Sequence, residues 1–193
     1  DLLITNSFTL GGALIDLNGN TLTLGNSAAA SLTYTAGRVF GGTFKRWFPV
    51  ASITSTSGSY YGLFPIGTST QYRPITINST VNPTTAGYVL ATHTDDNGAT
   101  ALTYTDNQGV AIQQIATMHS DLTTIGLAGG TYNLDVKYTS LGTVGSVTNL
   151  RLITYTSNTP GSYGTHAATT SSVAAPLTHR TGLSVSNLNN AWV

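Results

Sequence analysis

The sequence contains no cysteine and no glutamate, and it carries little charge of either sign. The absence of cysteine excludes disulfides, thiol catalysis and thiolate metal sites. Seven Lys and Arg residues balance seven Asp residues, so the formal net charge is zero. That balance excludes a nucleic-acid binder held by phosphate electrostatics and a polybasic membrane patch. Long apolar runs are also lacking, so the sequence predicts no transmembrane helix.

Threonine is abundant instead, with 35 copies among 193 residues, and ten tyrosines accompany it. Both residue types favour half-buried strands, whereas Lys and Glu, which favour exposed helices, are scarce or absent. Hydrophobic residues make up 40% of the chain, which is enough for a core. The composition therefore predicts an all-β fold, an antiparallel β-sandwich. A surface rich in Thr, Ser, Asn and Gly, without cysteine, indicates an exported protein.

The N-terminal part has its own pattern. Apolar and polar residues alternate up to Asn18-Gly19, a dipeptide that supplies the two positive φ angles of a tight turn. We therefore expect a hairpin over residues 13–24. This divides the chain into an N-terminal strand and hairpin at 1–30, packed on or donated to the sandwich, and a β-sandwich domain at 31–193.

The rest of the chain reads as strands separated by turn clusters, and no helix is required. Glycines at 37, 41 and 42 predict a bend in the extended unit 31–47. The segment 110–119 fits either a helix or a strand, and a strand is favoured. The other expected strands cover residues 60–64, 72–78, 87–94, 101–105, 132–138, 147–155 and 183–193.

Three motifs carry a family resemblance. They are TAGRVFGGTFKRW at 35–47, YGLFPIGT at 61–68 and YRPITI at 72–77, followed by NLRL at 149–152. In this order they resemble modules of long surface and secreted proteins of Bacteroidota that leave the cell by type IX secretion. The resemblance implies an extracellular or cell-surface, adhesin-like β-sandwich module. The motifs also have structural explanations, since Arg46 and Arg73 can tie strands to buried carbonyls or to an Asp.

The sequence contains few patterns that indicate catalytic chemistry. Residues 118–121 read Met-His-Ser-Asp, but neighbours on an extended chain point in opposite directions, and a hydrolase triad is assembled from separate segments. The acids are all Asp and mostly sit beside turn residues, so a glycosidase pair with one raised pKa is not indicated. The four histidines lack zinc-site spacing. We therefore assign no catalytic residues and expect a protein that is not an enzyme.

Calcium is the one cofactor that the sequence leaves open. Asp95, Asp96 and Asn97 form one turn cluster, and Asp106 belongs to the next. Their hard oxygen ligands could converge on a calcium ion, although neither cluster matches the EF-hand pattern. The alternative is that these residues form ordinary Asx turns.

Exposed aromatic residues offer a second kind of site. Trp47, Tyr60, Tyr61 and Tyr163 could form a flat platform for sugar rings, or they could pack in the core. The first reading makes the protein a carbohydrate-binding module, with or without calcium. This is the alternative function that the sequence supports.

The edge strands favour a structural function. With few lysines to protect its edges, a threonine-rich sandwich accepts a strand from another copy. The segment 2–10 is the natural donor, because its row of Leu2, Ile4, Phe8 and Leu10 presents an apolar face that fits a groove. We expect a non-catalytic structural or adhesive module that assembles with itself or with neighbouring modules of the same surface protein, into a fibre by strand addition.

Overall fold

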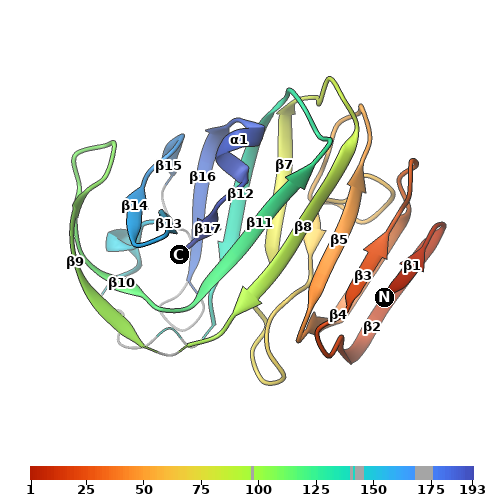
Figure 1. Ribbon diagram of the computed structural model, residues 1–193, viewed down its shortest axis with the longest axis horizontal. Helices are drawn as coiled ribbons and strands as arrows, with labels where there is room; N and C mark the ends of the chain where they lie inside the picture. Colours follow the sequence, from red (N-terminus) through yellow and green to blue (C-terminus); the bar gives the residue numbers. More distant parts are fainter. Residues whose placement is uncertain (97, 140, 142–145, 168–175) are drawn as a thin grey trace.

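Two β layers enclose one hydrophobic core, in a computed structural model that describes residues 1–96, 98–139, 141, 146–167 and 176–193. The predicted all-β, sandwich-like fold is confirmed (Figure 1). The larger layer has eight strands, in the order β1 (Leu2–Ile4), β3 (Thr21–Leu24), β5 (Thr43–Phe48), β8 (Gly87–Thr94), β11 (His119–Ile125), β17 (Ala191–Trp192), β13 (Thr154–Thr156) and β14 (Thr159–Gly161).

The second layer is built from a five-stranded and a two-stranded sheet. The five strands follow the order β15 (Thr165–Ala167), β16 (Leu177–Leu183), β12 (Thr131–Lys137), β7 (Ile75–Val81) and β6 (Leu63–Phe64). The other two are β2 (Ser7–Asp16) and β4 (Ser31–Phe40). A parallel bridge between Val39 and Ile66 joins β4 to the segment after β6, so the two sheets form a continuous layer.

The N-terminal strands pair in parallel, and the predicted hairpin at 13–24 is wrong. The strand β3 pairs with β1 and β5, whereas β2 pairs with β4, so β2 and β3 are not partners. Asn18 and Gly19 do adopt positive φ angles of 47° and 81°. Their turn, closed by the Asn20 N–H donating to the Leu17 carbonyl at 2.9 Å, leads from one layer to the other.

This arrangement forms two stacked rungs, which we call rung 1 (β1 and β2, residues 2–16) and rung 2 (β3 and β4, residues 21–40). The predicted donor strand at 2–10 is therefore not one strand, because a bend at Thr5 and Asn6 divides it between β1 and β2. The expected bend after Phe40 is confirmed, since Gly41 and Gly42 separate β4 from β5. The boundary at residue 30 stays a prediction, although strands from both sides of it share each layer.

Antiparallel pairing dominates the middle of the molecule, as expected from the alternation of side chains. In β12, Tyr132, Leu134 and Val136 are buried and their neighbours are half-buried. This strand pairs with β7 and β16, and β8 pairs with β5 and β11. The predicted strand at 87–94 matches β8 residue for residue.

Two expectations about the C-terminal third are wrong. The chain contains a short helix, α1 (Val185–Leu188), which Ser184 caps by accepting from the Asn187 N–H. The expected strand at 147–155 begins instead as a 3-10 turn at Val147–Asn149, and only its end joins β13. Ser and Asn at these positions offer the backbone local hydrogen bonds that compete with strand pairing.

A long ribbon extends from the end of the sandwich opposite the N-terminus (Figure 1). It consists of β9 (Ala99–Thr105) and β10 (Ala111–Ala116), which pair only with each other. The ambiguous segment 110–119 is thus a strand, as favoured. The ribbon continues from β8 and leads into β11, and its tip lies at residues 106–109.

Candidate functional site

Three fully buried arginines tie the two layers together. Arg46 on β5 donates to the carbonyls of Tyr61 and Leu63, the second at 3.1 Å. Arg73 forms an ion pair with Asp95 at 3.1 Å, and Arg180 donates to the Leu152 carbonyl at 2.7 Å. Burial lowers the pKa of Arg46 to about 9, so the guanidinium stays charged at neutral pH. The predicted structural roles of Arg46 and Arg73 are confirmed.

The N-terminal end of the sandwich is open in both layers. Among the residues that the structure describes, β1 is the last strand of the eight-stranded sheet, and β2 pairs on one side only, with β4. Three aliphatic side chains are exposed here, with accessible fractions of 57% for Leu2, 49% for Leu3 and 54% for Leu14. Two unpaired backbone edges with apolar side chains form a surface suited to strand addition.

The structure separates the four residues of the predicted assembly strand. Leu2 and Ile4 lie on β1, and Phe8 and Leu10 lie on β2. Leu10 is buried, Ile4 and Phe8 pack against the core, and Leu2 is mostly exposed. The row therefore faces the space between the layers within its own molecule, and only its first member remains available at the open end.

The opposite end is capped by the ribbon tip. Asp106 is 4% exposed, and its Oδ1 accepts from the N–H groups of Gln108 and Val110, both at 2.9 Å. Its Oδ2 lies 3.6 Å from Arg151 Nε and 3.7 Å from Arg180 Nη2. Burial acts to raise the pKa of Asp106, but the backbone donors and the two arginines outweigh it and hold this pKa below its usual value.

Further hydrogen bonds fix the tip to the segment that joins β14 to β15. Asn107 donates from its backbone to Ser162 Oγ at 2.8 Å and from its side chain to the Gly164 carbonyl at 2.6 Å. The Gln108 side chain accepts from the His166 N–H at 2.8 Å. The ribbon tip is thus hydrogen-bonded to the segment that joins the edge strands β14 and β15, in contrast to the outer edges of rung 1.

The predicted calcium ligands serve other partners. Asp95 pairs with Arg73, Asp106 belongs to the ribbon cap, and Asp96 accepts from the Gly98 N–H at 3.0 Å in an Asx turn. Asn97 lies outside the described residues. Among the residues described, no group of three acidic or histidine side chains is arranged to hold a metal ion. The calcium site stays a prediction.

The four aromatic residues proposed as a sugar platform come from different parts of the fold. Trp47 lies on β5, Tyr60 and Tyr61 lie between β5 and β6, and Tyr163 lies between β14 and β15. The ring contacts recorded for the described chain join none of these four to one another. Trp47 instead makes a T-shaped contact with Tyr88, with ring centroids 4.8 Å apart.

A serine, a histidine and an aspartate do come together inside the sandwich. Ser120 Oγ lies 3.0 Å from His93 Nδ1, and His93 Nε2 lies 3.8 Å from Asp95. Ser120 is fully buried, however, and burial lowers the pKa of His93 to about 4. Asp95 pairs more closely with Arg73 than with the imidazole. The group lacks the exposed nucleophile and the poised base that hydrolysis needs.

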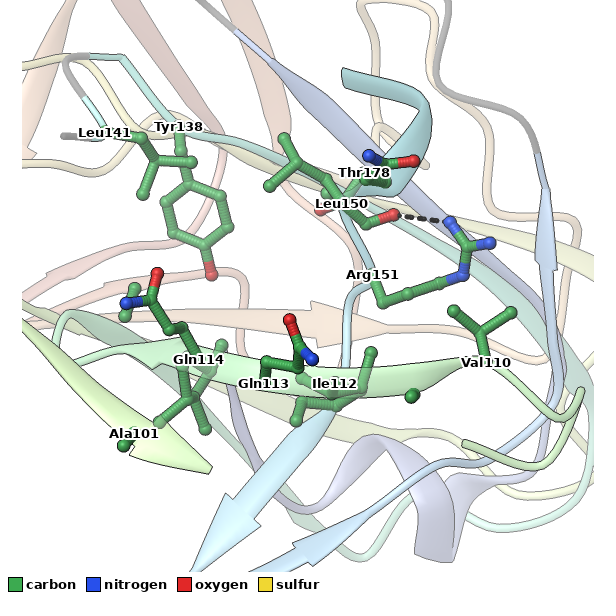
Figure 2. A pocket seen from close by; sticks show the side chains of 16 residues that line it. Ala101, Val110, Ile112, Gln113, Gln114, Tyr138, Leu141, Leu150, Arg151 and Thr178 are labelled. Carbon is green, nitrogen blue, oxygen red and sulfur yellow. Dashed lines mark hydrogen bonds between the residues drawn. The ribbon is translucent and has the colours of Figure 1, made fainter. Parts of the chain in front are cut away.

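A cavity of about 750 Å³ lies beneath the ribbon. Val110 and the strand β10 line one wall, and Tyr138, Leu141, Leu150 and Arg151 line the other (Figure 2). The Arg151 guanidinium donates to the carbonyls of Thr148 and Leu150, both at 2.9 Å. Aliphatic and amide groups predominate, and no carboxylate or imidazole belongs to the described lining. Such a cavity offers packing rather than acid–base chemistry.

Comparison with known proteins gives no relative: no family model, no curated protein and no solved structure matches the chain. No helix in the described part of the chain is long and apolar enough to cross a membrane. The open end of rung 1 therefore has to be interpreted from its own geometry. The open end could not be predicted from local sequence patterns, because the parallel pairing that creates it joins residues 20 or more positions apart.

Proposed function

We propose that this chain is a non-catalytic structural module of an extracellular surface protein, and that it joins other modules by strand addition at its open N-terminal end. The observation that carries the proposal is the unpaired edge of rung 1 in both layers at once. Strand addition to such an edge gains main-chain hydrogen bonds, and apolar side chains add affinity.

The construction of the interior supports a structural role. The three buried arginines bridge the layers near the rungs, in the middle and at the ribbon cap. The Ser120 hydroxyl beside His93 is fully buried, so it is not accessible to a substrate. The extracellular location is proposed from the low charge, from the surface rich in Thr, Ser, Asn and Gly, and from the resemblance of the motifs at 35–47, 61–68 and 72–77 to those of Bacteroidota surface modules.

The test is the assembly state of the purified chain. Light scattering and electron microscopy at neutral pH would compare it with the double variant Leu2→Lys/Leu14→Lys, which places charge at the open end. The matched control is Val50→Lys/Val81→Lys, since both valines are 58% exposed and lie away from rung 1. We expect concentration-dependent association of the wild type and the control, and its loss in the first variant.

Two results would contradict the proposal. One is a wild-type chain that stays monomeric up to high micromolar concentration. The other is association that the open-end variant and the control variant weaken equally. Circular dichroism of each variant would verify that the fold is retained.

Carbohydrate binding is the second candidate, and the aromatic pair on the outer face of the eight-stranded sheet favours it. Trp47 contacts Tyr88, Lys45 Nζ lies 3.9 Å from the Tyr88 ring centroid, and the Tyr88 hydroxyl donates to Asn26 at 2.8 Å. Aromatic rings beside amide and ammonium groups suit sugar recognition. A glycan screen would test this, with Trp47→Ala expected to abolish binding and Tyr60→Ala to preserve it.

A further inference from the structure

We infer that the open end receives a further parallel rung, contributed in tandem by a neighbouring module of the same surface protein, so that this chain forms the terminal cap of a β-solenoid. The inference rests on the proposed function and names its partner. It depends on three features of the rungs, which concern their hydrogen bonds, their side-chain ladders and their glycines.

The hydrogen bonds between rungs continue around the corners. Leu17 and Gly19, at the corner after rung 1, donate to the carbonyls of Phe40 and Gly41 at 2.9 and 2.6 Å. In the reverse direction, rung 1 accepts at Ile4 from the Gly25 N–H at 2.8 Å. Rung 1 is therefore bonded to rung 2 along both strands and both turns. On its other side, rung 2 pairs with β5 along β3, whereas rung 1 has no pairing on its outer side among the described residues.

The inward side chains form ladders that run through successive rungs. Leu2 is in register with Leu22 and then Phe44, and Ile4 is in register with Leu24 and then Arg46. In the second layer, Phe8 is in register with Leu32. Leu22 is 1% exposed because the strands β1 and β5 lie on either side of it, but Leu2, at the same position of rung 1, is 57% exposed. An added rung with aliphatic residues at these positions would continue each ladder.

The glycines also show that rung 2 is enclosed on the side where rung 1 is open. A methyl group added at Gly37, in rung 2, would lie 2.3 Å from the Ala13 carbonyl oxygen of rung 1. A methyl group added at Gly12 or Gly19 would meet nothing within 4 Å, although both residues also have positive φ angles. Gly37 is thus confined by a neighbouring rung, and Gly12 faces the space that a preceding rung would fill.

Polarity and charge indicate that a tandem rung continues the open end better than the end-to-end contact that purified copies can make with each other. The strands β1, β3 and β5 all pair in parallel, whereas two copies related by a two-fold axis would have to pair these edges antiparallel. Asp1 and Asp16 are the only charged side chains among the first 37 residues, so the surface suits an uncharged rung. Lys-rich or acidic strands would bring unpaired charge against it.

The experiment adds a rung by duplication. Leu2 and its partner Leu22 are 20 residues apart, so a tandem copy of residues 1–20 fused ahead of Asp1 keeps the register. The control carries the same 20 residues in shuffled order. Amide exchange of β1 and β2 and thermal unfolding would be measured for both proteins at a concentration where each is monomeric.

We expect the tandem copy to slow amide exchange in β1 and β2 by about tenfold or more and to raise the Tm, while the shuffled copy changes neither. Exchange equal in the two proteins would overturn the inference. If the wild type also associates through its open end, a failed tandem copy contradicts the parallel rung and leaves the proposed function standing. If the wild type does not associate but the tandem rung is protected, the inference stands and self-assembly fails.

Discussion

The two ends of the sandwich differ in how their edge strands are protected. At the ribbon end, a short segment joins the edge strands β14 and β15, and the tip of the ribbon is bonded across it. At the N-terminal end, β1 and β2 leave their outer edges without partners among the described residues. Unprotected edges promote association, and natural proteins usually block those that have no function. The strand addition that we propose at the open end would account for this difference.

The ends also differ in the forces that hold them. Rungs 1 and 2 are held by parallel backbone ladders and aliphatic packing, with no ion pair recorded among the described residues of 1–40. The ribbon cap depends on Asp106 and two arginines that are removed from water. Backbone ladders can be extended by any strand of suitable pattern, whereas a buried charge cluster fits one partner only. The proposed strand addition therefore concerns the open end alone.

Removal of the buried carboxylate gives the largest expected effect. Asp106→Asn leaves Arg180 and Arg151 without their counter-charge, and breaking such a buried pair costs about 3–5 kcal/mol. For a domain of this size we expect the Tm to fall by roughly 10 °C, measured by calorimetry. Asp16→Asn is the control, because Asp16 is exposed and accepts only the nearby Asn18 N–H at 2.9 Å. Equal losses in the two variants would contradict a special role for the cap.

The glycines provide the next test. Gly37→Ala should cost about 2–3 kcal/mol, because positive φ and a close backbone contact act together. Gly12→Ala, with positive φ but open space, should cost about 1 kcal/mol. Urea unfolding would measure both. A Gly12→Ala cost as large as that of Gly37→Ala would show that rung contact does not distinguish these positions.

The strands of the middle were predictable because their signal is local. Alternation over residues 132–138 and 87–94 identifies β12 and β8 directly. The rungs could not be predicted in this way. Asn18-Gly19 has the turn chemistry of a hairpin, but the same two φ angles form a corner between layers, and the choice depends on partners at least 20 residues away. Local turn chemistry fixes the bend and leaves the pairing open.

The candidate sites, too, could be predicted only where the signal in the sequence is local. The burial of Arg46 and Arg73 could be inferred, since an arginine in an uncharged strand region needs carbonyl or carboxylate partners. Asp106 was expected in solvent beside Asn107 and Gly109, yet the ribbon brings it onto Arg180, 74 positions along the chain. The meeting of Ser120 with His93 likewise depends on the register between β8 and β11.

Acid should weaken the ribbon end before the rungs. The pKa of His93 and of His166 is lowered to about 4, by burial first and by nearby arginines next, against 6.5 in the unfolded chain. The unfolded state then binds more protons between these values, so stability is complete above about pH 6.5 and falls as the pH drops toward 4. Each histidine contributes at most about 1.4 kcal/mol per pH unit, and solvent screening reduces this at His166.

One histidine has the opposite effect on the pH dependence of stability. Asp135 raises the pKa of His179 by accepting its hydrogen bond, so that contribution is present below about pH 6.5 and lost as the pH rises above it. Residues 1–92 contain no histidine. Exchange measured at pH 7 and 5 and corrected for intrinsic rates should show protection lost in β10 before β3, and His166→Gln should reduce the difference. Earlier loss in β3 would contradict this account.

The smallest effect is expected at the first position of the ladder. Leu2→Ala should cost less than about 1 kcal/mol, because more than half of the side chain is already exposed, whereas Leu22→Ala, one rung further in, should cost about 2–5 kcal/mol. Thermal unfolding would resolve the two. In the protein with the tandem rung, Leu2 becomes an interior position, so the cost of Leu2→Ala should rise toward that of Leu22→Ala. If it stays below about 1 kcal/mol there, the added rung does not cover the open end.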